Sequence, residues 1–211
     1  MSNFEFIPEP EQYQNSNIYQ FMKKYNILSL EELSEKSKNN LEWFWESVEK
    51  DIGIIWDMPY TKTLDISNGI PWAKWFVNGK TNLYKSSVEK FTKQTPEKIV
   101  YNFISEDGIE TKLSYAELNK KVSKLANGFK SLGIKKGDVI AIYLPMIEEA
   151  IISILAAAKI GAVQTIVFSG YSSESLKTRL QDCHAKILLT SDGFYRKGKG
   201  VSQKTTVDNA V

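Results

Sequence analysis

The segment from Gly193 to Lys199 has the residue types that could bind a phosphate group. It reads Gly-Phe-Tyr-Arg-Lys-Gly-Lys and follows a predicted strand, which matches the spacing G-x-x-x-x-G-K of a phosphate-binding P-loop. The next residue is Gly200, where a P-loop has the Ser or Thr that binds magnesium. The sequence therefore argues against a true P-loop.

The same segment can also be interpreted as a cationic loop. Arg196, Lys197 and Lys199, with Lys204 nearby, could bind an anionic group through charge-assisted hydrogen bonds. The alternative is a run of solvated surface charge, and the residues taken alone favour that alternative.

A second candidate is the segment Ser169-Gly-Tyr-Ser-Ser173, which precedes a predicted helix. Backbone N–H groups at the start of a helix can bind an anion. The simpler interpretation is N-capping by Ser172, with Glu174 well placed against the helix dipole. We expect the serines to serve mainly as caps.

His184 is the only histidine, and Asp182 and Cys183 adjoin it. Three consecutive residues do not have the spacing of a metal site, and Ser169–Ser173 does not supply the G-x-S-x-G pattern of a nucleophile elbow. We expect His184 at the end of a helix. The sequence predicts no catalytic residue and no metal ligand.

A strand–helix–strand–helix–strand pattern between residues 135 and 192 must position these segments. The first predicted strand, 139–144, is nearly all apolar, as in a parallel sheet that is covered on both faces. The helix after it is apolar almost all round and should be buried. Ligands usually bind at the carboxyl ends of such strands. The other predicted elements are the helices 147–159 and 174–183 and the strands 162–168 and 186–192.

The residues before this pattern are predicted to form helices, an aromatic segment and a hairpin. Residues 1–16 look like a flexible lead-in, and Ser29 with Glu32, and Ser114 with Glu117, fit capping boxes. Residues 52–82 look irregular and are rich in aromatic side chains. They are better explained as an anchored arm than as a base-stacking surface, because no basic groove accompanies them. The remaining predictions are helices from Asn17, from 30 to 37, after Asn40 and from 82 to 93, a hairpin of 100–104 with 110–113, a turn at Asn78-Gly79, and a left-handed C-cap at Gly133 that ends the helix after Ser114.

Composition favours a protein of the cytoplasm. The net charge of +2, from 27 basic and 25 acidic residues, speaks against nucleic acid or an anionic membrane as the main partner. One cysteine cannot form an internal disulfide, the first residues lack the features of a signal peptide, and the apolar run 150–158 is shorter than the roughly 20 residues that span a bilayer.

Several motifs, in the same order along the chain, resemble the N-terminal part of AMP-forming acetyl-CoA synthetases and their short-chain acyl-CoA synthetase relatives. The resemblance extends from about residue 17 to the last residue. The motifs that carry it are 71–82 (PWAKWFVNGKTN), 132–138 (LGIKKGD), 142–146 (IYLPM), 161–172 (GAVQTIVFSGYS) and 189–192 (LTSD).

This resemblance implies an α/β fold with a helical, Trp-rich N-terminal arm at 17–82. Residues 83–211 would form the first, incomplete part of the large domain of the adenylate-forming enzymes, with a mainly parallel sheet layer. Such enzymes use ATP and Mg²⁺ to convert a carboxylate, here most simply acetate, to an acyl-adenylate. They then transfer the acyl group to coenzyme A.

The resemblance also reverses the interpretation of the cationic loop. It implies that Arg196, Lys197, Gly198 and Lys199 meet the nucleotide end of coenzyme A. Family members usually have a second Arg where Lys199 stands, and Lys keeps the charge but lacks the bidentate fork of Arg. Ser169 and Gly170 stand where the family has Gly-Gly near the coenzyme channel.

The parts of the family's machinery that bind ATP, magnesium and the acyl group lie beyond residue 211 in the family. We therefore expect this chain to be inactive in adenylation by itself. The alternatives are a non-catalytic binding or assembly module, or one half of a split synthetase that pairs with a separate chain.

Overall fold

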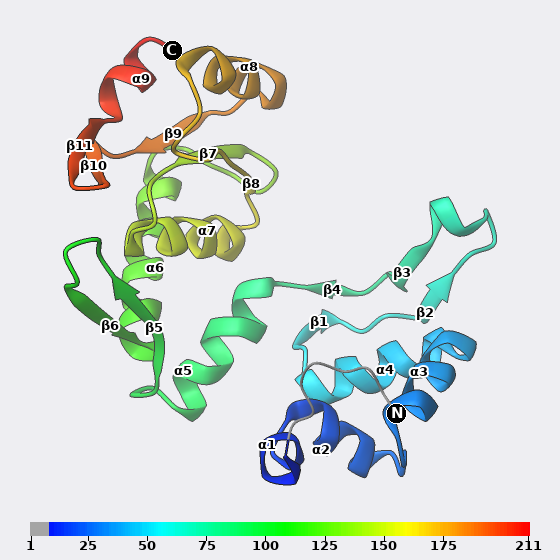
Figure 1. Cartoon of the computed structure of the whole chain (residues 1–211). Helices are drawn as coiled ribbons and strands as arrows, with labels where there is room; N and C mark the ends of the chain where they lie inside the picture. Colours follow the sequence, from blue (N-terminus) through cyan, green and yellow to red (C-terminus); the bar gives the residue numbers. More distant parts are fainter. Residues whose placement is uncertain (1–8) are drawn as a thin grey trace. The chain divides into compact units, whose positions relative to one another are not determined.

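The computed structural model describes residues 9–211. The described residues form two compact units, 9–81 and 82–211, which run from blue to cyan and from green to red in Figure 1. Of the lead-in predicted at 1–16, residues 1–8 lie outside the described part. Pro10–Gln14 form the short helix α1.

Within residues 9–81, α1 is followed by the helices α2 (Asn17–Lys24), α3 (Leu30–Asn39) and α4 (Leu41–Ile52). Asn40 caps α4 as predicted, because its side-chain oxygen accepts a hydrogen bond from the Trp43 amide at 3.0 Å. The helices bury a small apolar cluster that gives this unit its core. Its buried members are Phe21, Met22, Ile27 and Leu33.

The predicted capping box of α3 is only half formed. Ser29 does cap the helix, since its Oγ accepts from the Glu32 amide at 3.1 Å. The Glu32 carboxylate, however, accepts from the Leu28 amide at 2.8 Å and not from the amide of Ser29. The predicted partner of the Glu32 carboxylate, the Ser29 amide, was therefore wrong. The flexible Glu32 side chain reaches one residue further back, to the Leu28 amide.

The aromatic segment, predicted to be irregular, contains short antiparallel strands. β1 (Trp56–Met58) pairs with β4 (Lys80–Thr81), and β2 (Lys62–Asp65) pairs with β3 (Lys74–Val77); the 3₁₀ turn η1 (Ile70–Trp72) lies between β2 and β3. The indole N–H of Trp56 donates to the Glu49 carboxylate at 2.7 Å, and its ring lies 5.5 Å from that of Phe76. The chain's 5 tryptophans all lie in this unit.

The second unit begins with a distorted helix and a hairpin. The π-helical turn η2 (Lys85–Glu89) continues into α5 (Lys90–Gln94), and the hairpin consists of β5 (Ile99–Ile104) and β6 (Glu110–Ser114). The capping box that starts α6 (Tyr115–Ser131) is confirmed. Ser114 Oγ accepts from the Glu117 amide, and the Glu117 carboxylate accepts from the Ser114 amide.

A three-stranded parallel sheet forms the centre of the second unit, as the apolar pattern predicted. Its strand order is β8–β7–β9, and β7 pairs in parallel with both neighbours. Residues 140–143 of β7 are all buried. The bounds are β7 Val139–Tyr143, α7 Glu148–Ile160, β8 Val163–Ile166, α8 Ser173–Cys183 and β9 Ile187–Thr190.

The main core lies where α6 and α7 meet β7 and the β5–β6 hairpin. Its fully buried side chains include Leu118, Phe129 and Ile140, and α7 contributes Ala156 and Ala157. The nearly all-apolar sequence of α7 is thus explained by burial. The unit ends with a second hairpin, β10 (Gly193–Arg196) with β11 (Lys199–Ser202), and the short helix α9 (Lys204–Asp208).

No helix within residues 9–211 is long and apolar enough to cross a membrane.

Candidate functional site

The cationic segment forms the turn of the β10–β11 hairpin, in which Arg196 pairs with Lys199. Lys197 and Gly198 both have positive φ, 53° and 71°. Two central residues with positive φ are what a tight type I′ hairpin turn requires. A P-loop continues into a helix, whereas here a strand follows the turn, so the P-loop interpretation is wrong. We refer to residues 196–199 as the cationic turn.

The cationic turn presents its charges to solvent. The side chains of Arg196, Lys197 and Lys199 are exposed, and none of them forms a salt bridge with a carboxylate among residues 9–211. Lys204, which was grouped with them on the sequence, instead pairs with Asp208 one helical turn later. Three positive charges on a short turn, none of them in a salt bridge among residues 9–211, suit an anionic ligand.

Gln203 connects this hairpin to the central sheet through hydrogen bonds. Its side chain is only 1% exposed. Its amide nitrogen donates to the Tyr143 carbonyl at 2.9 Å, and its amide oxygen accepts from Ser191 Oγ at 2.7 Å. Its backbone N–H donates to the Asp192 carbonyl at 2.9 Å. The position of the hairpin is therefore set by a buried amide at the end of β7.

Tyr143 also forms hydrogen bonds with the second predicted segment, Ser169–Ser173. Its hydroxyl donates to the carbonyls of Ser169 at 3.0 Å and Tyr171 at 2.8 Å. The ring is buried, and this burial raises the pKa of its phenol. Tyr143 remains a neutral donor at physiological pH, so it can bridge the two carbonyls.

Gly170 is a position where the backbone and an aromatic ring approach closely. A Cβ atom built on it would lie 2.6 Å from a ring carbon of Phe168. Any larger residue would therefore displace the Phe168 ring, which is 64% exposed. The capping role that we expected for Ser172 is confirmed, because its Oγ accepts from the Ser175 amide.

The two predicted segments begin at the same edge of the sheet. Ser169 follows β8 and Asp192 follows β9, and β7 ends between them at Tyr143. The carboxyl ends of parallel strands lie together. Sequence reasoning found this edge, but it missed Tyr143 and Gln203. A Tyr at the end of an apolar strand was the only available signal.

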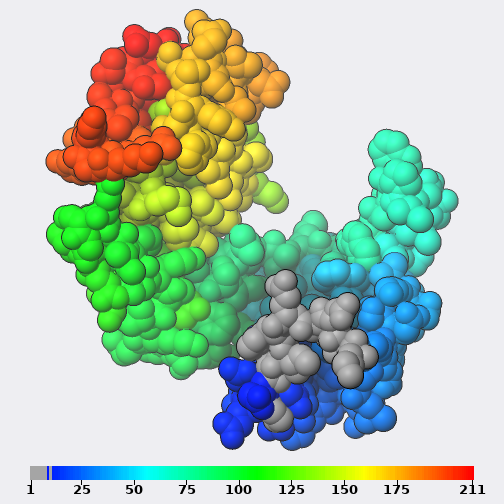
Figure 2. All heavy atoms as spheres, viewed as in Figure 1, coloured from blue at the N-terminus to red at the C-terminus, as the bar shows by residue number. Residues whose placement is uncertain are grey.

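Glu106 is a further residue that the sequence did not single out. It lies in the turn between β5 and β6, and its Oε1 accepts a hydrogen bond from the backbone N–H of Gly198 at 3.1 Å. In Figure 1 the β5–β6 and β10–β11 hairpins approach each other at this end of the unit, and Figure 2 shows both hairpins at the surface.

His184 caps the C-terminal end of α8 with a left-handed φ of 51°, as expected for a residue that ends a helix. The thiol of Cys183 donates to the Leu180 carbonyl within the same helix. Among residues 9–211 there is no group of three or more His, Cys, Asp or Glu side chains that could hold a metal ion.

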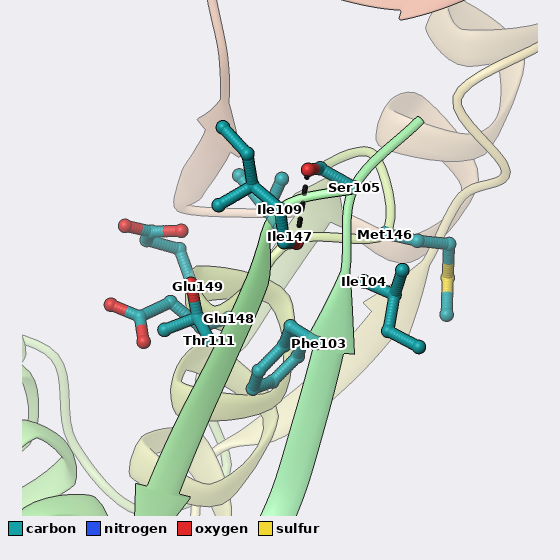
Figure 3. A pocket seen from close by; sticks show the side chains of 9 residues that line it. All are labelled: Phe103, Ile104, Ser105, Ile109, Thr111, Met146, Ile147, Glu148 and Glu149. Atoms are coloured by element: carbon teal, nitrogen blue, oxygen red, sulfur yellow. Dashed lines mark hydrogen bonds between the residues drawn. The ribbon is translucent and has the colours of Figure 1, made fainter. Parts of the chain in front are cut away.

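A shallow pocket of about 290 Å³ lies between the β5–β6 hairpin and the start of α7. Figure 3 shows its mostly apolar lining, with Phe103 and Ile104 from one strand and Met146 and Ile147 from the segment before α7. The hydroxyl of Ser105 is engaged with the Ile109 carbonyl at 3.1 Å. The pocket offers no cation to a ligand.

Family profiles match nearly the whole described chain. The profile of the AMP-binding enzymes matches residues 88–211, and that of the acetyl-coenzyme A synthetase N-terminus matches residues 30–86. The chain belongs to the AMP-binding enzyme family. The resemblance that the sequence motifs indicated is thereby confirmed.

Similar proteins place this AMP-binding enzyme chain near the acetyl-CoA synthetases. It is 44% identical over 198 residues to an acetyl-coenzyme A synthetase of Methanothrix thermoacetophila, covering 93% of this chain and 30% of that protein. It is 37% identical to acetyl-coenzyme A synthetase 2 of Saccharomyces cerevisiae, covering 99% of this chain and 30% of that protein. The chain thus spans about 30% of the length of these relatives.

A solved structure has the same fold. The acetoacetyl-CoA synthetase from Streptomyces lividans superposes with a TM-score of 0.88 at 24% identity, covering 96% of this chain and 32% of that chain. The expected α/β fold is therefore confirmed.

Proposed function

We propose that this chain supplies the N-terminal arm and the coenzyme A-facing edge of an acyl-CoA ligase of the acetyl-CoA synthetase type. The reaction converts ATP, a carboxylate and coenzyme A to acyl-CoA, AMP and diphosphate through an acyl-adenylate, with acetate as the expected carboxylate. The observation that carries the proposal is the similarity over 93% of the chain to an acetyl-coenzyme A synthetase. The exposed cationic turn of this chain adds support, because it could bind the phosphates of coenzyme A.

In this proposal the cationic turn binds the anionic nucleotide end of coenzyme A. The guanidinium of Arg196 and the ammonium groups of Lys197 and Lys199 supply charge-assisted donors. Gly198 allows the left-handed turn that brings these side chains together. Lys199 acts as a point charge, so Arg196 provides the only bidentate donor of the turn.

Ser169 and Gly170 have a different part in the same proposal. They line the approach of the coenzyme, and Gly170 keeps the backbone close to the Phe168 ring. Tyr143 and Gln203 are positioning residues. Tyr143, the last residue of β7, donates to the Ser169 carbonyl, and Gln203 at the end of the cationic hairpin donates to the Tyr143 carbonyl. The chemistry of adenylation would be supplied by ATP and Mg²⁺ bound elsewhere in the whole enzyme.

The binding role is tested by replacing Arg196 with Ala and measuring the dissociation constant for coenzyme A by calorimetry. Loss of one exposed, charge-assisted contact should weaken binding by about fivefold. Lys177→Ala is the matched control, because Lys177 is an exposed cation on α8, outside the turn. An unchanged constant for Arg196→Ala would remove this residue from the site.

We also propose that these 211 residues do not catalyse adenylation by themselves. The support is the share of the relatives that the chain spans, about 30%, and the lack of a Ser/Thr/Gly-rich phosphate loop in this sequence. The measurement is acetate-dependent exchange of diphosphate into ATP with the purified chain. Exchange above the acetate-free background would refute this part of the proposal.

A further inference from the structure

The cationic turn contacts an anion supplied by the chain itself. Glu106 Oε1 accepts a hydrogen bond from the Gly198 N–H at 3.1 Å, across 92 positions of sequence. This is the contact that an anionic ligand would make with the backbone of the turn, because a backbone N–H is a common donor to phosphate oxygens.

A ligand could replace Glu106 in its hydrogen bond with the Gly198 N–H. Glu106 is exposed, and it forms no salt bridge with the cations of the turn among the described residues. Its neighbours in the β5–β6 turn are engaged elsewhere, since Ser105 bonds both Asp107 and the Ile109 carbonyl. A single exposed hydrogen bond therefore holds Glu106 at the cationic turn. Exposed charged contacts of this kind contribute little free energy and are easily replaced by a competitor.

We propose that Glu106 occupies the anion-binding position of the cationic turn and competes with the ligand, so that it selects ligands that carry a doubly charged phosphate. This inference rests on the proposed binding of coenzyme A at the turn. A carboxylate has one negative charge, whereas a phosphate monoester carries close to two at neutral pH and offers three acceptor oxygens. A phosphate monoester can therefore displace Glu106, but a singly charged anion gains little by doing so.

A purely structural role for Glu106 predicts the opposite result. If Glu106 only braced the turn, its loss would let Lys197 and Gly198 leave their left-handed conformations, and the ligand would bind more weakly. If it competes, its neutral replacement should strengthen binding. The direction of the change in affinity therefore separates the two roles.

The experiment uses adenosine 3′,5′-bisphosphate, which has the 3′-phosphate monoester of coenzyme A and a single 5′-phosphate in place of its 5′-diphosphate. Calorimetry measures its dissociation constant for the full chain, for Glu106→Gln and for Glu110→Gln. Glu110→Gln removes the same charge from the same hairpin, at a residue that bonds Asn102 and not the cationic turn. We expect Glu106→Gln to tighten binding by about two- to fivefold, the range of an exposed charged contact, and Glu110→Gln to change it by much less.

A second measurement follows the Gly198 amide by NMR. Adding the bisphosphate to the wild-type chain should move this resonance as the Glu106 bond is replaced, and Glu106→Gln should reach the same end point at a lower ligand concentration. Unchanged or weaker binding by Glu106→Gln would overturn the inference.

The Arg196→Ala variant distinguishes failure of the inference from failure of the proposed function. If Arg196→Ala weakens binding while Glu106→Gln leaves it unchanged, the coenzyme A site stands and the competition by Glu106 falls. If no variant binds the bisphosphate, both the site and the inference are refuted.

Discussion

Replacing Gln203 with Met should detach the cationic hairpin from the sheet while nearly preserving the volume of the side chain. Gln203 is 1% exposed, and its amide bonds the Tyr143 carbonyl and Ser191 Oγ. Methionine has a similar length and can fill the same space. It provides neither the donor nor the acceptor that the two partners need.

The expected loss follows from these two hydrogen bonds. A neutral buried hydrogen bond contributes about 1 kcal/mol, and a buried acceptor left without a donor costs about 1–3 kcal/mol. The Ser191 hydroxyl can rotate toward the Gly193 carbonyl, which it already approaches at 3.3 Å. The Tyr143 carbonyl loses the side-chain donor that Gln203 supplies. We therefore expect the free energy of unfolding of the second unit to fall by about 2 kcal/mol.

Amide hydrogen exchange is the suitable assay, because it reports protection residue by residue. Exchange of buried amides in β7 and of the Val207 amide in α9 should become faster in Gln203→Met. The matched control is Gln181→Met, which makes the same chemical change at an exposed position of α8 and should alter stability by less than about 0.5 kcal/mol.

The same variant also tests the positioning role of Gln203 in the site. A hairpin that is less firmly held should bind coenzyme A more weakly than the wild-type chain does. A stability loss below about 0.5 kcal/mol for Gln203→Met, or an equal loss for Gln181→Met, would refute the assignment of Gln203 as the link between β7 and the hairpin.

Two further predictions concern stability away from the site. Asn82→Ala should destabilise the second unit by about 2 kcal/mol in urea denaturation, because its side chain donates to the carbonyls of Ala158 and Lys159 and accepts from the Tyr84 amide. The control is Asn127→Ala, at an exposed position. Equal losses of stability in the two variants would contradict the reasoning. The hydrogen bonds from Lys186 and from the Lys135 amide lower the pKa of Asp138, so its stabilising effect is present above the unfolded pKa of about 3.9 and is lost as pH falls through the folded pKa. In Asp138→Asn the free energy of unfolding should therefore fall less steeply as the pH is lowered. An unchanged dependence of that free energy on pH would show that the Asp138–Lys186 ion pair does not contribute to stability.

The central sheet could be predicted from sequence because its signals are local and strong. The apolar strand at 139–144 and the nearly all-apolar helix after it match β7 and α7 to within one residue at each end. The parallel direction of the strands could also be expected to bring their carboxyl ends to one edge of the sheet. These features follow from burial on both faces of a parallel sheet, which leaves a clear trace in the residue types.

The strands of the cationic hairpin and of the aromatic segment could not be predicted in this way. β11 reads Lys-Gly-Val-Ser, with every residue exposed, so it shows no alternation of apolar and polar side chains. Its turn uses Lys197-Gly198, without the Asn-Gly or Asp-Gly signal that announces a hairpin. The buried contacts of Gln203 and the bond from Gly198 to Glu106 join residues distant in sequence, and only the folded chain reveals such pairs.

The distribution of tryptophan gives the molecule a built-in spectroscopic label. All 5 tryptophans lie between residues 43 and 75, in the first unit, and the unit that carries the cationic turn has none. Intrinsic tryptophan emission therefore reports on the first unit alone. A change in emission during a titration with coenzyme A would reveal communication from the second unit to the first. A constant emission, with binding seen by calorimetry, would show that the first unit does not sense the ligand.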